Sequence, residues 1–368
     1  MLATPHALTA PREVRLIGEC RFTPRPQAGA HRDAQLESAK AAVGSFRVRW
    51  GEPAWRERVA ATDRPATISG ARPNPASRAY YKLAEIMRTC ALAPDRRTLH
   101  LCDAPGGFAQ AVRDWTPTVK EVVVTSRRSN GSILFAPSVV RDDACVVELQ
   151  DLAHGADLLR ASVRDQIAAA APACDLVTAD GAVDNDAQPD LAEVNNARLL
   201  AAEVLTVLRA QREGGSCVIK VFSIAADITR ECIALLAYCY QATSLIKPYT
   251  SRAVNDERYV VCQCFSPAKA AEFHALHLPD EPCGACLVSL GIVADPAWYA
   301  ELDPVVHHMN LQQLRAINAA LTCTSPAAAP PSHRKPGRSR PGDLRPTQGP
   351  TERSTRPRSR ESTRPHRS

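Results

Sequence analysis

Continuous apolar stretches alternate with stretches in which apolar residues recur every three or four positions, from about Ser45 to Pro267. The first pattern is typical of strands buried on both faces, and the second is typical of the helices that cover them. The alternation predicts an α/β fold with a mostly parallel sheet between two layers of helices. Seven strands are expected, at Leu99–Cys102, Glu121–Thr125, Ala144–Leu149, Leu176–Ala179, Ser216–Phe222, Ser244–Ile246 and Tyr259–Phe265.

Helices are expected before and between these strands. Gly214–Gly215 follows the fourth helix and is expected to end it, because glycine is common just after a helix terminus. The helices are predicted at Arg78–Ala91, Gly107–Trp115, Ala156–Ala171, Asp190–Arg212 and Ala225–Tyr240.

The sequence on either side of this region has a different character. Residues 1–44 contain scattered Pro, Gly and Arg without a firm period, and we expect a loosely structured extension with a helix near Ala34–Val43. Residues 268–325 are expected to form a small helical annex. Residues 326–368 are rich in Pro, Arg and Ser and have too few apolar residues to offset the entropy of ordering, so a disordered tail is predicted.

Basic charge is concentrated in that tail. The whole chain has 45 Lys and Arg against 39 Asp and Glu. From His333 onward there are 11 basic and 3 acidic residues, which leaves the body of the chain nearly neutral. A flexible arginine-rich tail suits loose contacts with phosphates. A targeting segment without a catalytic role is the alternative.

Composition excludes several classes of protein. No apolar run reaches the roughly 18 to 20 residues that cross a bilayer, and the N-terminus lacks the apolar core of a secretory signal. An intracellular protein, nuclear or cytoplasmic, is expected. The 13 cysteines are odd in number and mostly lie in apolar runs, so we expect free thiols. Cys283 and Cys286 form a single CxxC pair without a second pair at zinc spacing, and no metal site is predicted.

A glycine turn follows the first predicted strand directly. Its sequence, Asp103-Ala104-Pro105-Gly106-Gly107-Phe108, leads into a helix. Ligands of open α/β sheets bind outside the carboxyl ends of the strands, and small residues there allow close approach of the backbone. The turn therefore predicts a nucleotide-like ligand. It is neither the dinucleotide pattern nor a Walker phosphate loop.

Four charged residues lie beside the ends of predicted elements. Asp180 follows the fourth strand, Lys82 is on the helix before the first strand, and Glu257 precedes the last strand. Each of these three, taken singly, fits an ordinary surface charge. Lys220 differs, because it lies inside the apolar run Val218–Phe222 and a buried lysine is costly unless it is paired or neutral.

Five short segments together resemble the FtsJ-type (RrmJ-like) ribose 2′-O-methyltransferases. The resemblance covers roughly Arg72 to Phe265, and the motifs occur in the family's order. The segments are Ser77–Leu83, Asp103–Phe108, Thr178–Gly181, Val218–Phe222, and Lys247–Arg252 with Glu257–Val261. The resemblance implies a Rossmann-like, S-adenosylmethionine-dependent methyltransferase domain at residues 45–267.

The resemblance also assigns roles to residues. It implies a catalytic tetrad of Lys82, Asp180, Lys220 and Glu257. The cofactor is expected to contact Asp103, Ala104, Pro105, Gly106, Gly107 and Phe108 in the turn, together with Asp151 and Asp180. Two departures are His100, where the family commonly has an acid, and Thr125 with Ser126, where an acid often holds the cofactor ribose.

RNA is the implied substrate. Phe108 and the segment Ile133–Pro137 look more like the cap-methylating branch of eukaryotes and large DNA viruses. We therefore expect methylation of the first nucleotides of capped mRNA. Methylation of ribosomal or other structural RNA is the alternative within the class, and a catalytically silent RNA-binding scaffold is the alternative outside it. Protein partners and oligomeric state stay open.

The chemistry explains the need for these residue types. A ribose 2′-hydroxyl is a poor nucleophile until a positioned base takes its proton, and Lys220 is the expected base. Burial and neighbouring cations lower the pKa of a lysine, whereas Asp180 and Glu257 raise it. RNA bases often stack on aromatic rings. Candidates for stacking, or alternatively for core packing, are Trp50, Trp55, Tyr80, Tyr81 and Tyr249.

Overall fold

A computed structural model describes residues 3–24, 29–63, 68–127, 133–149, 152–183, 191–280 and 285–323. Asp151, Cys283 and the basic tail lie outside these residues, so the predictions made for them are not addressed by the structure. No helix in the described ranges is long and apolar enough to cross a membrane. The described cysteines are all free thiols, as expected.

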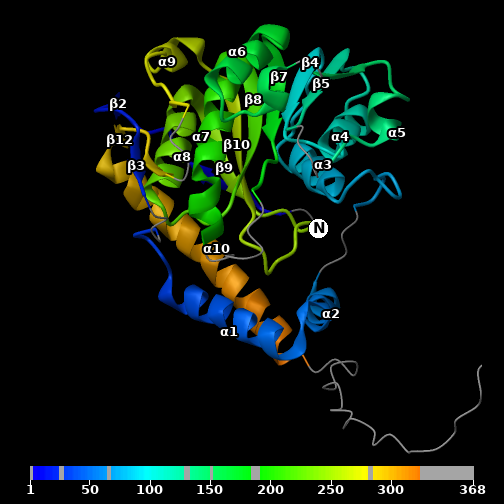
Figure 1. Ribbon diagram of the computed structural model, residues 1–368, viewed down its shortest axis with the longest axis vertical. Coiled ribbons are helices and arrows are strands. Elements are labelled where there is room, and N and C mark those ends of the chain that lie inside the picture. Colours follow the sequence, from blue (N-terminus) through cyan, green and yellow to red (C-terminus); the bar gives the residue numbers. More distant parts are fainter. Residues whose placement is uncertain are drawn as a thin grey trace, which may run out of the picture. The chain divides into compact units, whose positions relative to one another are not determined.

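An eight-stranded, mostly parallel sheet forms the centre of the molecule (Figure 1), with the order β1-β9-β10-β8-β7-β4-β5-β6. The strands from β8 to β6 pair in parallel, and β10 pairs antiparallel with both β8 and β9. All seven predicted strands are present. They are β4 (Arg97–Leu101), β5 (Glu121–Thr125), β6 (Val146–Glu148), β7 (Cys174–Ala179), β8 (Gln211–Val221), β9 (Tyr240–Ile246) and β10 (Arg258–Phe265).

The order of the strands reverses between β4 and β7. From β4 the chain runs outward through β5 and β6, and it then returns to add β7 and β8 on the other side of β4. The carboxyl ends of two neighbouring strands are therefore followed by loops that diverge, which is the usual place for a ligand in an open α/β sheet. The predicted glycine turn and Asp180 follow these two strands.

Helices cover both faces of the sheet, as predicted (Figure 1). Two apolar cores result, one on each face of the sheet. The helices on one face are α3 (Ala79–Thr89), α4 (Gly107–Trp115) and the short α5 (Pro137–Val140), and those on the other are α6 (Ala161–Ala170), α7 (Ala192–Ala210) and α8 (Asp227–Cys239). A short 3₁₀ helix, η1 (Ala153–Ala156), precedes α6.

The predicted end of the fourth helix was wrong. α7 ends at Ala210, and Gly214 and Gly215 lie within strand β8. A Cβ atom on Gly215 would lie 3.0 Å from the carbonyl oxygen of Cys174 on the neighbouring strand. The glycine thus allows β8 to pass close to β7, and it does not terminate the helix.

The N-terminal extension and the annex are folded together, which corrects two expectations. β2 (Val14–Leu16) pairs with β12 (Ile292–Ala294), and β3 (Arg21–Thr23) pairs with β11 (Cys286–Ser289). β1 (His6–Leu8) adds the eighth strand to the main sheet. The extension is therefore not loosely structured in its described part, and the annex is not only helical. Such short strands with distant partners leave no local periodicity to detect.

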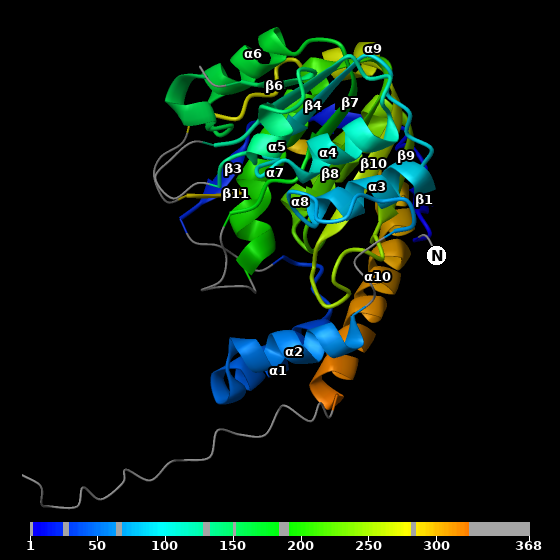
Figure 2. The same ribbon diagram turned by 90° about the vertical axis from the view of Figure 1, so that its right-hand side faces the viewer.

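Three helices form a separate small core beside the sheet. α1 (Ala34–Trp50) extends beyond the predicted helix, and α2 (Glu52–Thr62) follows it directly. Both pack against α10 (Pro296–Thr322), the long C-terminal helix that follows α9 (Pro267–Ala271) and β12. Figures 1 and 2 show these helices together at one end of the sheet. Their shared apolar residues are Leu36, Ala39, Val43, Trp55, Val59, Ile317 and Ala320.

Candidate active site

The four predicted catalytic residues converge beside the carboxyl ends of the central strands. Asp180 follows β7, and Lys220 lies near the end of the neighbouring β8. Glu257 directly precedes β10, whose first residues pair with Val221 and Lys220. Lys82 comes from the first turn of α3. The strand register thus brings together residues from distant parts of the sequence.

The tetrad consists of two ion pairs. The Lys82 amine donates to Glu257 Oε2 over 2.7 Å. The Lys220 amine lies 3.1 Å from Asp180 Oδ1, and it donates to the backbone oxygen of the same residue over 2.6 Å. The side chain of Lys220 is only 7% exposed, and the other three are between 13% and 16% exposed. The two cations and two carboxylates balance in a nearly buried cluster.

A second set of groups, not identified from the sequence, holds the two carboxylates in place. The Tyr259 hydroxyl donates to Asp180 Oδ1 over 3.0 Å, and the Ser251 hydroxyl donates to Glu257 Oε1 over 2.7 Å. Lys247 donates to the backbone oxygen of Glu257 over 2.6 Å. Tyr259 pairs in register with Lys220, so a correct alignment of the last strand would have placed it beside the site.

The charges of the cluster shift its pKa values in opposite directions. Burial alone would lower the pKa of Lys220, but Asp180 and Glu257 outweigh burial and raise it above the ordinary value. Burial acts to raise the pKa of Glu257, yet Lys82 and the other nearby lysines hold it at about 2. The ligand-free site therefore contains ionised Glu257 and a protonated Lys220 at neutral pH.

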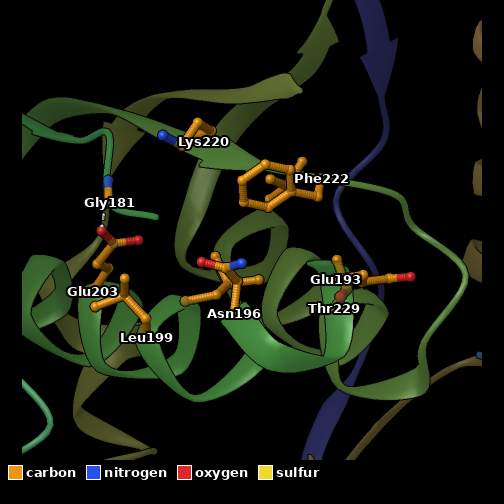
Figure 3. Close-up of a pocket in the computed structure, with 10 residues that line it drawn as sticks. Gly181, Glu193, Asn196, Leu199, Glu203, Lys220, Phe222 and Thr229 are labelled. Atoms are coloured by element: carbon orange, nitrogen blue, oxygen red, sulfur yellow. Dashed lines mark hydrogen bonds between the residues drawn. The ribbon is translucent and has the colours of Figure 1, made fainter. Parts of the chain in front are cut away.

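A small pocket lies next to Lys220 on the α7 side of the sheet (Figure 3). Glu203 of α7 accepts the backbone N–H of Gly181 over 3.1 Å, which fixes the residue after Asp180. Burial raises the pKa of Glu203 to about 8. Figure 3 shows Glu203 and Asn196 below Lys220. The pocket is further lined by Gly181, Glu193, Leu199, Leu200, Val221, Phe222 and Thr229.

The first residue of the glycine turn anchors a helix. The carboxylate of Asp103 accepts the backbone N–H groups of Phe108 and Ala109, each over 2.9 Å, at the start of α4. Burial raises the pKa of Asp103 to about 7. Phe108 is fully buried, and its ring centroid lies 6.2 Å from that of Tyr259. These contacts give both residues a clear role in positioning the turn.

The two glycines of the turn are required by neighbouring protein groups. Gly106 has a φ of +107°, and a Cβ there would lie 2.7 Å from the Val139 side chain. A Cβ on Gly107 would collide with Ser77 Oγ and would lie 2.8 Å from the backbone nitrogen of Tyr80. Gly107 therefore permits α4 to pack against the start of α3, the helix that carries Lys82.

The end of β5 offers a polar group without a protein partner. The Thr125 hydroxyl is buried and has no hydrogen-bond partner among the residues that the structure describes. The Thr125 carbonyl accepts the N–H of Asp103 over 3.4 Å, so the hydroxyl belongs to a residue that contacts the glycine turn. Buried polar groups are normally satisfied, and an orphaned one beside such a turn fits a bound ligand.

His100 is a structural residue of β4. Its ring nitrogens lie 3.0 Å from the Thr98 hydroxyl and 2.7 Å from that of Thr178. Burial lowers the pKa of His100 to about 3, so the ring is neutral. Of the predicted stacking candidates, Trp55, Tyr80 and Tyr81 are buried in the core, whereas Trp50 and Tyr249 are partly exposed.

A family comparison agrees with this arrangement. The FtsJ-like methyltransferase family matches residues 75–265, just over half of the chain. The chain belongs to the FtsJ-like methyltransferase family. This membership confirms the predicted methyltransferase fold and enzyme class, and it confirms S-adenosylmethionine as the cofactor.

Sequence relatives include viral and animal proteins. The chain is 31% identical over 193 residues to the cap-specific mRNA (nucleoside-2′-O-)-methyltransferase of Autographa californica nuclear polyhedrosis virus, covering 52% of this chain and 73% of that protein. It is 27% identical over 210 residues to the cap-specific mRNA (nucleoside-2′-O-)-methyltransferase 2 of Drosophila melanogaster, covering 50% of this chain and 29% of that protein.

One relative is described as inactive. It is the inactive cap-specific mRNA (nucleoside-2′-O-)-methyltransferase 1B of Caenorhabditis briggsae, 39% identical over 88 residues, which are 24% of this chain and 10% of that protein. The chain thus spans most of the viral relative but only a small part of the two animal proteins.

Proposed function

We propose that this enzyme transfers a methyl group from S-adenosylmethionine to a ribose 2′-hydroxyl at the 5′ end of capped mRNA. The observation that carries the proposal is the pair of buried ion pairs at the reversal of strand order, with Lys220 fixed by the carboxylate and by the backbone oxygen of Asp180. The relatives named as cap-specific mRNA methyltransferases support this substrate.

The residues around the glycine turn fit the cofactor. The unpartnered Thr125 hydroxyl supplies a polar group at the end of β5, and Ala104 and Pro105 are partly exposed residues at the end of β4. Asp180 borders the same region after β7. Asp103, Gly106, Gly107 and Phe108 support this cradle through the contacts they make with α3, α4 and α5. When bound, the cofactor supplies an electrophilic methyl group on a positively charged sulfur.

Lys220 is the proposed general base. It has to be neutral to accept the hydroxyl proton, although Asp180 and Glu257 raise its pKa in the ligand-free site. A second positive charge close to an ammonium lowers its pKa, and the sulfonium of the cofactor is such a charge. Lys220 Nζ would then accept the 2′-hydroxyl proton, and the methyl group would pass to the ribose oxygen as its bond to the cofactor sulfur breaks, which leaves a neutral thioether. Glu257 meanwhile holds Lys82 as a fixed positive charge beside the reacting oxygen.

Two alternatives to this proposal are distinguished by the experiment described below. Ribosomal or other structural RNA is the alternative substrate. A silent RNA-binding scaffold is the alternative role, and the family does contain a relative described as inactive. The complete set of paired catalytic groups favours an enzyme, because a scaffold has no need of a lysine held in an apolar strand.

The test is methyl transfer from radiolabelled cofactor to one short RNA with and without a 5′ cap. We expect label on the capped RNA, confined to a ribose 2′-oxygen of the first nucleotides, and at least tenfold less on the uncapped RNA. Equal labelling of both RNAs would mean that the enzyme does not require the cap and methylates an internal ribose. No labelling of either RNA, or of structured ribosomal fragments, would support the scaffold.

A further inference from the structure

A second hollow lies between helix α2 and the loop that leads to Glu257. It encloses about 430 Å³, a volume that includes its open mouth. We call it the arginine groove. Its lining residues are Arg47, Glu52, Trp55, Arg56, Val59, Ala60, Asp63, Arg78, Arg252, Val254 and Asn255.

The arginine groove carries an excess of positive charge. Four arginines face two acids across the lining. Glu52 lies 3.0 Å from both Arg47 and Arg56, so one carboxylate serves two guanidinium groups. Arg252 is exposed and forms no ion pair within the part of the chain that the structure describes. The described groove therefore offers cationic groups to an anionic ligand.

Apart from Asn255, the remaining lining residues are apolar. Trp55 and Val59 are buried and belong to the small three-helix core, and Ala60 and Val254 lie beside them. These buried side chains form the wall of the groove, and a positively charged groove is typical of sites that follow the phosphate backbone of single-stranded nucleic acid.

The arginine groove shares two segments with the tetrad. Arg78 caps the start of α3, four residues before Lys82, which corresponds to about 6 Å along the helix axis. Arg252 follows Ser251, whose hydroxyl binds Glu257. Arg78 also donates to the Thr250 carbonyl over 3.3 Å, which joins the two segments. A strand of RNA with its target ribose at Lys220 would thus have these arginines next to it.

We propose that the arginine groove binds the phosphate backbone of the RNA strand adjoining the methylated nucleotide. This inference rests on the proposed function and adds the path of the substrate to it. α1 and α2 precede the matched family region, which begins at residue 75. The N-terminal helices therefore add a substrate-binding wall to the family's catalytic domain.

The test is fluorescence anisotropy of the full chain with a short single-stranded RNA at several salt concentrations. Arg56→Ala with Arg252→Ala removes two exposed cations that support no core packing. We expect affinity to fall at least tenfold at low salt, and the slope of log K against log salt to become shallower by roughly 0.7 for each lost phosphate contact. Affinity for S-adenosylmethionine should not change.

Arg96→Ala is the matched control. Arg96 is an exposed arginine just before β4, at the end of the strand opposite to the one that leads into the glycine turn. It should bind RNA within about twofold of wild type. Glu52→Gln should change RNA affinity in the opposite direction to the double variant. It releases Arg47 and Arg56 from their ion pairs, so RNA binding should tighten several-fold.

The outcomes separate this inference from the proposed function. If the double variant and Arg96→Ala bind RNA equally well, the arginine groove does not hold RNA, whatever the result of the methyl-transfer assay. If the double variant loses affinity but wild type methylates no RNA, the arginine groove stands and the catalytic proposal fails. Both assays use the full-length chain, and thermal melting of each variant verifies folding.

Discussion

The tetrad and the arginine groove use charge in contrasting ways. In the tetrad, two cations and two carboxylates are balanced and nearly buried, with each amine within 3.1 Å of its carboxylate. In the arginine groove, four guanidinium groups face two carboxylates, and Arg56 and Arg78 are respectively 70% and 43% exposed. The balanced cluster fixes geometry and proton affinity, whereas the unbalanced one attracts an anionic ligand.

The contrast predicts that the two regions fail differently when altered. A change in the tetrad should affect the chemical step and leave RNA affinity nearly intact. A change in the arginine groove should weaken RNA binding and its salt dependence, with little effect on turnover at saturating RNA. A variant that changed both the rate of the chemical step and the affinity for RNA would contradict this separation of roles.

The largest effect is expected for Lys220→Ala. Loss of a general base typically costs on the order of 10² to 10⁴ in rate. Single-turnover methyl transfer should fall by that amount, while anisotropy with RNA and calorimetry with S-adenosylmethionine stay within about twofold of wild type. Activity within a few-fold of wild type would remove Lys220 from the role of base.

The next effect is the pH dependence of methyl transfer. Asp180 and Glu257 raise the pKa of Lys220, and only its neutral form accepts a proton. The single-turnover rate should therefore rise with pH, by about tenfold per unit below the pKa that Lys220 has in the complex with cofactor and RNA. RNA binding in the arginine groove should stay flat over the same range, because guanidinium groups remain charged.

One control is needed for that profile. Burial raises the pKa of Glu203 to about 8 and lowers that of Lys247 to about 8, so both titrate in the same window. Glu203→Gln should retain the rise in rate if Lys220 is the titrating base. A rate that does not vary with pH anywhere in the range where the protein stays folded, with chemistry rate-limiting, would contradict the assignment.

The sequence was sufficient for the central sheet and the tetrad, for a physical reason. Long apolar runs and helical periodicity are local signals, and β5 and α4 begin and end at the predicted residues. The closeness of Asp180 and Lys220 follows from the neighbouring parallel strands β7 and β8, whereas Lys82 comes from helix α3 and Glu257 precedes the antiparallel strand β10. The four proposed catalytic residues lie in short motifs in a known order, and the fold brings those motifs together.

Other features depended on contacts between distant residues and had no local signal. The β2–β12 and β3–β11 pairs join short strands from opposite ends of the chain. The close packing at Gly107, where a Cβ would meet Ser77 and Tyr80 at the start of α3, is another contact without a local signal. The arginine groove combines α2 with the loop before Glu257, and neither segment alone has a basic run.

The smallest effect is expected at the C-terminal tail, which lies outside the described residues. Truncation after Ser325 removes all 11 basic residues that follow Ser332, along with 3 acidic ones. Because the arginine groove adjoins the tetrad, a short RNA should still reach it, and turnover at saturation should change by less than about twofold. A longer RNA has phosphates beyond the arginine groove. For such an RNA the full chain should show a steeper salt dependence than the truncation, by roughly 0.7 per phosphate that the tail neutralises. Anisotropy on the two RNA lengths measures this difference. Identical salt slopes for both proteins on the longer RNA would mean that the tail does not touch RNA, and a targeting or partner-binding segment would then be the better interpretation.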